Sequence, residues 1–241
     1  MKTKSKLLPI CVIGVAFMLG LSVWSAVDGE AFGSDISVNN EDKLKAFAAL
    51  QIEKAELQSK LGANSIYPEF RSSIEEEKLL DKSEATAINT AEKALIEREA
   101  LYWYAVNHGI QLTDEEVQQR IEAVIADAKK AENYDEIAAA CKAAGTTFEA
   151  TMLENKEFYK KEYTNSDLYN AKLSAFSEGK NGLNGEQLAD WESYWDNFVD
   201  TTISEYKRTR NYTILDSAID TSKELIKKNI TDLSRIKASE T

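Results

Sequence analysis

The sequence predicts an all-α protein, folded as a multi-helix bundle with an orthogonal or irregular arrangement. Only two prolines and ten glycines occur among the 241 residues, which is far too few for an all-β or loop-rich protein. Apolar residues recur at spacings of three, four and seven along most of the chain, as one face of an α-helix requires. Hydrophobic residues make up 43% of the chain, so it can bury a core.

The net charge of −12 restricts the partners that this chain can bind. Proteins that bind nucleic acid need clustered lysine and arginine side chains to contact the phosphates. We therefore expect no nucleic acid as a partner.

The first 26 residues have the pattern of a targeting segment. Three lysines precede an apolar run from Leu7 to Val23, and small residues near Ala26 would suit a cleavage site. The run is also near the shortest length that can span a bilayer, so the leader is either cleaved or kept as an anchor. In both cases the rest of the chain is expected outside the cytoplasm, secreted or anchored to the outer face of the membrane. Residues 27–40 are polar and predict a linker.

A helical domain is expected over residues 41–236. Its first helix, Glu41 to Leu61, is predicted to stop at Gly62. The segment from Asn64 to Pro68 is typical of a turn. Residues Glu75 to Ser83 are highly charged, and we interpret them as the solvated start of the next helix.

The most complete helix signals lie between Gly109 and Val117. Gly109 can take the left-handed conformation that ends many helices. Thr113 and Glu116 predict a capping box, in which each residue satisfies an amide of the first helical turn. Leu112 and Val117 stand where a hydrophobic staple would form. A helix that ends and another that begins are therefore expected here.

The same pattern recurs at Gly145, where Thr146 and Glu149 predict a second capping box. From Phe148 to Phe176 the periodicity predicts one long helix.

A loop rich in glycine and asparagine follows, and a last helical region is expected from Glu186 to Ile236. The segment from Arg210 to Thr213 is the one candidate for a break in this region.

The sequence shows no motif of a catalytic, cofactor or metal site. The patterns HExxH, CxxC, GxSxG and the phosphate loop do not occur. His108 is the only histidine, and its place beside Gly109 favours contact with the last carbonyl groups of a helix. Cys141 is the only cysteine after the leader and is interpreted as a small core residue. We expect no enzyme, no cofactor and no metal.

Aromatic and methionine residues are the candidates for a binding surface. The consecutive Tyr102, Trp103 and Tyr104 point in different directions, so at most two can share the buried face of one helix. Trp103 and Tyr104 are expected to be more exposed, because Tyr102 and Val106 already lie on the apolar stripe. The simpler interpretation places most of these side chains in the core. The alternative is an apolar cradle for unfolded chains, formed by Tyr102, Trp103, Tyr104, Met152, Tyr159, Tyr163, Trp191 and Trp195.

Four segments, in their order and spacing, resemble the N-terminal chaperone domain of the SurA and PrsA foldases. They are Leu95 to Ala100, Gly109 to Val117, Ala140 to Gly145 and Thr147 to Met152, and the similarity covers residues 85–165. In that family a helix ends at a glycine, an acidic amphipathic helix follows, and a short helix ending in glycine precedes a longer one.

The resemblance implies an ATP-independent chaperone that holds unfolded exported polypeptides in a helical cradle. It also implies that a C-terminal helix packs back on the N-terminal helices. The chain has neither the extra length nor the histidines of the family's parvulin domain, so no prolyl isomerase activity is expected. It also lacks the lipidation cysteine that is usual in PrsA-type proteins. If the leader is kept rather than cleaved, residues 7–23 are the candidate membrane tether.

A second interpretation is a membrane-tethered helical adaptor or structural protein that binds one specific partner. A flat apolar stripe along residues 186–236 would favour this interpretation. A concave surface lined by aromatic and methionine side chains would favour the chaperone.

Overall fold

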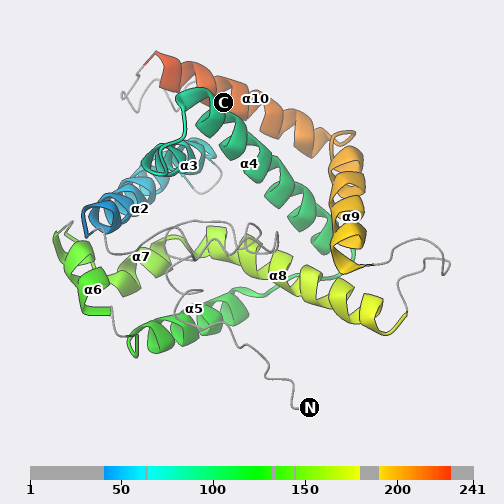
Figure 1. The fold of residues 1–241 in the computed structure, drawn as a ribbon, viewed down its shortest axis with the longest axis horizontal. Helices are drawn as coiled ribbons and strands as arrows, with labels where there is room; N and C mark the ends of the chain where they lie inside the picture. The colour runs from blue at the N-terminus through cyan, green and yellow to red at the C-terminus, as the bar shows by residue number, and fades with distance from the viewer. Residues whose placement is uncertain (1–40, 63–64, 132–133, 144, 180–189, 229–241) are drawn as a thin grey trace.

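The computed structural model describes residues 41–62, 65–131, 134–143, 145–179 and 190–228, and in these residues it contains helices and no strand (Figure 1). The all-α prediction is confirmed. The helices are α2 (Glu41–Leu61), α3 (Tyr67–Leu79), α4 (Glu84–Asn107), α5 (Asp114–Ala128), α6 (Tyr134–Ala143), α7 (Phe148–Glu154), α8 (Lys156–Ser177), α9 (Trp191–Tyr206) and α10 (Arg210–Lys227).

The expected leader (1–26) and linker (27–40) lie outside the described residues, as do the ends of the predicted C-terminal helical region at 186–189 and 229–236. Within the described helices, none combines the length and the apolar character needed to cross a membrane.

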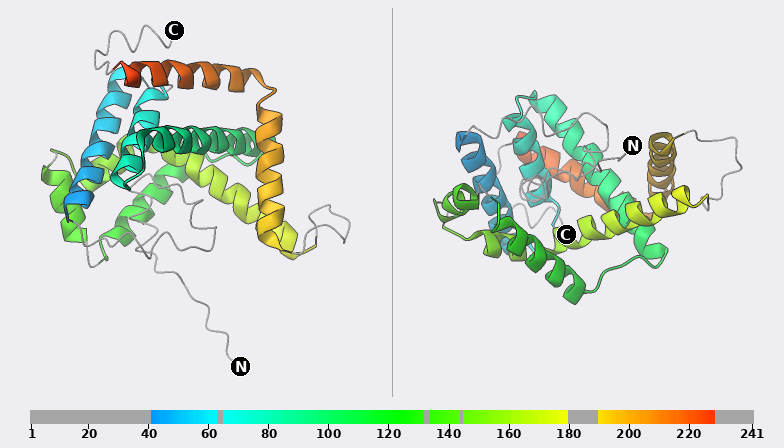
Figure 2. Two further views of the ribbon diagram at one scale, coloured as in Figure 1. Left: turned by 45° about the horizontal axis from the view of Figure 1, so that its top comes forward. Right: turned by 60° about the horizontal axis from the view of Figure 1, so that its bottom comes forward.

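Helix α4 is the centre of the fold. It packs against α3, α8, α9 and α10. The pair α2 and α3 lies at one end of the molecule and α9 at the other, with α10 running between them over one side (Figures 1 and 2). Helices α5, α6 and α7 form a separate layer that contacts α8 and α2.

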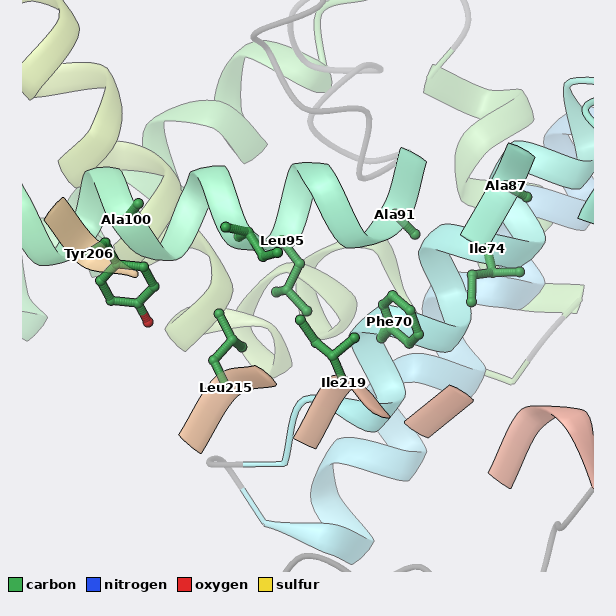
Figure 3. Close-up of a cluster of buried hydrophobic side chains, with 10 residues drawn as sticks. Phe70, Ile74, Ala87, Ala91, Leu95, Ala100, Tyr206, Leu215 and Ile219 are labelled. Carbon is green, nitrogen blue, oxygen red and sulfur yellow. The ribbon is translucent and has the colours of Figure 1, made fainter. Parts of the chain in front are cut away.

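The largest core cluster joins α3, α4 and α10. Phe70 and Ile74 of α3 meet Leu95 of α4 and Leu215 and Ile219 of α10 (Figure 3). Side chains that are far apart in the sequence therefore share one interior. This packing confirms that the C-terminal helical region folds back on the N-terminal helices.

A second core cluster lies among α5, α6, α7 and α8. It contains Leu112 and Val117, the two residues of the predicted staple, packed with Phe148 and Met152. Cys141 is buried in the same cluster, and burial raises the pKa of its thiol. The interpretation of Cys141 as a small core residue is confirmed.

The predicted helix signals around Gly109 are confirmed. Gly109 has a positive φ of 78°, and the amide of Ile110 donates to the carbonyl of Ala105 at 2.9 Å, which closes a Schellman ending. Thr113 and Glu116 form the capping box, with the glutamate accepting from the Thr113 amide at 2.8 Å. These local hydrogen bonds define where α4 ends and where α5 begins.

The second capping box is placed one residue too early by the sequence. Gly145 does end α6 with a positive φ, but the cap of α7 is Thr147, whose hydroxyl accepts from the amide of Ala150 at 3.1 Å. Glu149 instead pairs with Lys129 at 2.7 Å.

The prediction of one helix from Phe148 to Phe176 is wrong, because the chain breaks at Asn155. The Asn155 side-chain amide donates to the carbonyl of Thr151 at 2.8 Å, and its backbone leaves the helical region. The C-terminal region is likewise two helices. Its break covers Lys207 to Thr209, one turn before the segment that the sequence suggested, and the Thr209 hydroxyl caps α10.

The sequence also misplaced the helix that precedes α4. The segment from Asn64 to Pro68 was expected to be a turn, but Tyr67 and Pro68 begin α3, where proline fits the first turn. Glu75 and its neighbours end α3 rather than opening α4, which begins after the cap Ser83. Glu76 in this charged stretch is buried.

Candidate functional site

Six aromatic rings form a continuous row across α8, α9 and the end of α4. Ring centres follow one another at 5.5 Å (Phe176 to Trp191), 5.2 Å (Trp191 to Tyr169), 5.0 Å (Tyr169 to Trp195), 5.2 Å (Trp195 to Phe198) and 4.9 Å (Phe198 to Tyr104). We call these six residues the aromatic row. Trp195 is buried, and the other five rings are partly exposed.

Helical spacing brings these rings together. Tyr169 and Phe176 are seven residues apart on α8, and Trp191, Trp195 and Phe198 follow at spacings of four and three on α9. The Asp190 side chain caps α9 by accepting from the Ser193 amide at 2.8 Å, so Trp191 stands at the first helical position. The base beneath the row is apolar and contains Leu101, Ala105, Leu168 and Val199.

Polar atoms of the row have partners in the row or beside it. The Trp191 indole N–H donates to the Tyr169 hydroxyl at 2.8 Å. Lys172 donates to the Tyr104 hydroxyl at 3.1 Å, and its ammonium lies 4.3 Å from the centre of the Phe198 ring. Ring faces and edges, rather than unpaired polar atoms, are therefore what this surface offers to another molecule.

Four of the residues that the sequence put forward for a cradle lie in the interior. Met152, Tyr159 and Tyr163 belong to the second core, and Trp195 lies at the base of the aromatic row. Burial raises the pKa of Tyr163 to about 12 and moves that of Tyr159 in the same direction. In this conformation these side chains support the fold and do not line a surface.

The three consecutive aromatic residues of α4 are all partly exposed, so Tyr102 is not set apart from its neighbours. Trp103 packs on Tyr206, with ring centres 5.8 Å apart. Tyr104 stacks on His108 at 3.8 Å, and the His108 Nδ1 lies 2.7 Å from the Tyr104 carbonyl oxygen. The expected contact of His108 with the last carbonyl groups is confirmed.

The structure thus brings together three of the predicted candidates, Tyr104, Trp191 and Trp195, and places the others elsewhere. It adds Tyr169, Phe176 and Phe198 to them. The seven-residue spacing on α8 was the available signal for Tyr169 and Phe176. Nothing in the sequence showed that this face would meet α9.

A second distinctive feature is a group of charged side chains, four of them buried and three partly buried, between α2, α3, α4 and α8. We call it the buried charge cluster; it consists of Lys54, Glu69, Glu76, Arg98, Glu99, Lys161 and Glu162. Buried charges are costly unless they are paired and hydrogen-bonded. The described residues supply hydrogen bonds or ion pairs for Glu69, Glu76, Glu99 and Lys161 and for the terminal nitrogens of Arg98, whereas the Arg98 Nε is buried without a partner among them.

The half next to α2 is centred on Glu76. Its carboxylate accepts from Gln51 at 2.6 Å and from Ser72 at 2.8 Å. Burial raises the pKa of Glu76 to about 7, although the Lys54 ammonium and these two hydrogen bonds oppose the shift. Burial lowers the pKa of Lys54 to about 8, with the charge of Glu76 opposing. Burial also raises the pKa of Glu162, which faces both Arg98 and Lys54.

The other half is centred on Arg98. Its guanidinium pairs with Glu69 and, at 2.7 Å, with Glu99, and Lys161 also reaches Glu99 at 2.7 Å. Burial alone would raise the pKa of Glu99, but the two cations outweigh it and hold that pKa below its usual value. The ring of Phe158 lies where the two halves meet, 3.9 Å from the Lys54 ammonium and 5.4 Å from the Arg98 guanidinium carbon.

The described residues contain no group of three or more His, Cys, Asp or Glu side chains placed to hold a metal ion. Comparison of the chain with protein-family models, curated proteins and solved structures found no match.

Proposed function

We propose that this protein is an extracytoplasmic, ATP-independent chaperone that binds unfolded exported polypeptides, without prolyl isomerase activity. The observation that carries the proposal is the aromatic row. Five partly exposed rings over an apolar base provide contact area for varied apolar side chains at little cost in conformational entropy. The resemblance of residues 85–165 to the SurA and PrsA chaperone domains supports the same role.

The adaptor interpretation has less support. It called for a continuous apolar stripe along residues 186–236 that is free to pack on a partner. In the described residues this region is broken at Lys207 to Thr209, and Leu215, Ile219 and Leu225 are buried inside the molecule. Ile214 is the one large hydrophobic side chain of α10 that is well exposed, at 60%. A single exposed residue is ordinary on a soluble protein.

Suppression of aggregation tests the proposal. A chemically unfolded exported protein is diluted into buffer with the purified chain and no ATP, and light scattering is followed. We expect scattering to fall at near-stoichiometric ratios. The double variant Tyr104→Ser and Phe176→Ser should weaken this effect, because it removes both ends of the aromatic row.

The matched control is Ile214→Ser, which removes an exposed apolar side chain outside the row and should leave the activity unchanged. Circular dichroism shows whether each variant is folded. Unchanged scattering with several unrelated unfolded proteins would refute the chaperone proposal and leave the adaptor.

A further inference from the structure

Where α2 packs on α3, the most deeply buried of the described α2 side chains are polar. These are Gln51 and Lys54, which are almost fully buried and face Glu76 of α3. The larger described apolar side chains of α2 are partly buried; among them Leu57 and Leu61 pack in the cluster of Tyr67. An ion pair between Arg71 and Glu53 at 2.8 Å closes the exposed rim.

Several other helix contacts among the described residues are apolar at their centre. The contact between α3 and α10 is an example, since Phe70 and Ile74 pack there against Ile219. Docking through buried charges stabilises a helix less than docking through apolar side chains. Both charges lose their hydration, and their mutual attraction offsets only part of that free-energy cost. The docking of α2 on α3 is therefore sensitive to the ionisation of Lys54 and Glu76, which are both buried there.

The groups that face Glu76 from outside its own helix are Lys54 and Gln51 of α2. Lys54 in turn lies near the charges of Arg98 on α4 and Glu162 on α8. On α3 itself Ser72 donates to Glu76, and the neighbouring Glu77 adds a second negative charge. Beyond Arg98, the pairs with Glu69 and Glu99 and the Lys161 ammonium complete the charged surroundings.

We propose that α2 is a detachable cover of the fold, and that protonation of Glu76 as the pH falls below neutral tightens its attachment. With Glu76 neutral, one buried charge of the interface disappears, and Lys54 keeps Glu162 as a negative neighbour. With Glu76 ionised, both charges remain dehydrated for as long as α2 stays docked. Release returns Glu76 and Lys54 to water and uncovers the ring of Phe158, on which the Lys54 ammonium lies.

The sign of the pH dependence follows from linkage. A carboxyl group that binds its proton more tightly in the docked state stabilises that state as the pH falls from about 7 towards its ordinary value near 4.5. Lys54 acts in the opposite direction only above about pH 8, where the docked state favours the neutral amine. Between pH 5.5 and 7.5 the effect of Glu76 therefore exceeds that of Lys54, and Glu162, whose pKa burial also raises, acts in the same direction as Glu76.

Hydrogen exchange on the full chain tests this cover. Protection factors, corrected for the intrinsic exchange rate, are compared at pH 5.5 and 7.5 for amides of α2 and of α4. We expect the α2 amides to be roughly tenfold better protected at pH 5.5. Amides of α4 around Leu101, in the interior of the fold, should change much less.

Two variants isolate the responsible group. Glu76→Gln imitates the neutral carboxyl group, so α2 should be well protected at both pH values. Glu56→Gln makes the same change on an exposed carboxylate of α2 that pairs with Lys60, and should behave like the wild type. If Glu76→Gln does not fold, the variant Lys54→Met with Glu76→Gln removes both charges and should show the same loss of pH dependence.

Equal protection of α2 at the two pH values in the wild type would overturn the proposal, as would faster exchange of α2 in both charge-removing variants. The test uses the protein alone, so it does not depend on whether the chain binds unfolded polypeptides.

Discussion

The ring of Phe198 on α9 meets the ring of Tyr104 on α4 edge to face, with centres 4.9 Å apart and an interplanar angle of 88°. Aromatic pairs favour this geometry because the positive ring edge meets the negative ring face. The contact is where the aromatic row passes from α9 to α4. Packing between these two helices and continuity of the proposed binding surface therefore depend on the same pair.

Replacing Phe198 with leucine should lower the free energy of unfolding by about 1 kcal/mol, because apolar volume is largely kept while the aromatic pair is lost. Urea denaturation measures this loss. The control Ile214→Val, on an exposed side chain, should change stability by less than about 0.5 kcal/mol. Equal effects of the two substitutions would show that the edge-to-face contact contributes nothing.

Replacing Met152 tests whether this residue belongs to the core or to a binding surface. Its side chain is 0% exposed in the second core, so Met152→Ala should leave a cavity and cost about 2–5 kcal/mol. Thermal and urea unfolding measure the cost. If the free energy of unfolding falls by less than about 1 kcal/mol and the variant binds unfolded protein more weakly, Met152 contributes to binding rather than to the core.

Replacing Arg120 of α5 with lysine should weaken its pair with Asp167 of α8, because lysine cannot form both hydrogen bonds of this pair. The two hydrogen bonds measure 2.8 and 2.7 Å and use the planar guanidinium. Because the pair is partly exposed and screened by solvent, Arg120→Lys should cost only about 0.5 kcal/mol. A loss above about 2 kcal/mol would mean that the pair acts as a buried one.

Cys141 should resist thiol reagents in the folded protein. The side chain is buried, and burial raises its pKa, so little reactive thiolate is present near pH 8. Labelling with an aromatic disulfide reagent should be slow in buffer and fast in denaturant. Rapid labelling of the folded chain would show that the second core opens readily around α6.

The sequence was most informative where structure depends on a few neighbouring residues. The helix end at Gly109 and the capping box of Thr113 and Glu116 were predicted correctly, since each depends only on residues within a few positions in the sequence. The burial of Val117 followed from the same local pattern. These signals fix where helices begin and end, but not which helices meet.

The errors have a tertiary cause. The charged stretch containing Glu76 was interpreted as a solvated face. The hydrogen bond from Gln51 and the charge of Lys54, both on α2, offset part of the cost of burying Glu76, and the sequence pattern did not show that α2 packs there. The break at Asn155 carries neither glycine nor proline, so periodicity could not reveal it. The aromatic row was missed in part because its rings come from three helices whose meeting no local pattern encodes.

Site-specific photocrosslinking tests the central claim most directly. A photoreactive phenylalanine analogue is placed at Phe176, in the aromatic row, or at Ile214, which is more exposed but lies outside it. Each chain is irradiated with a labelled unfolded exported protein. The aromatic row predicts strong crosslinking from position 176 and little from position 214. Equal crosslinking from both positions, or none from position 176, would contradict binding at the row.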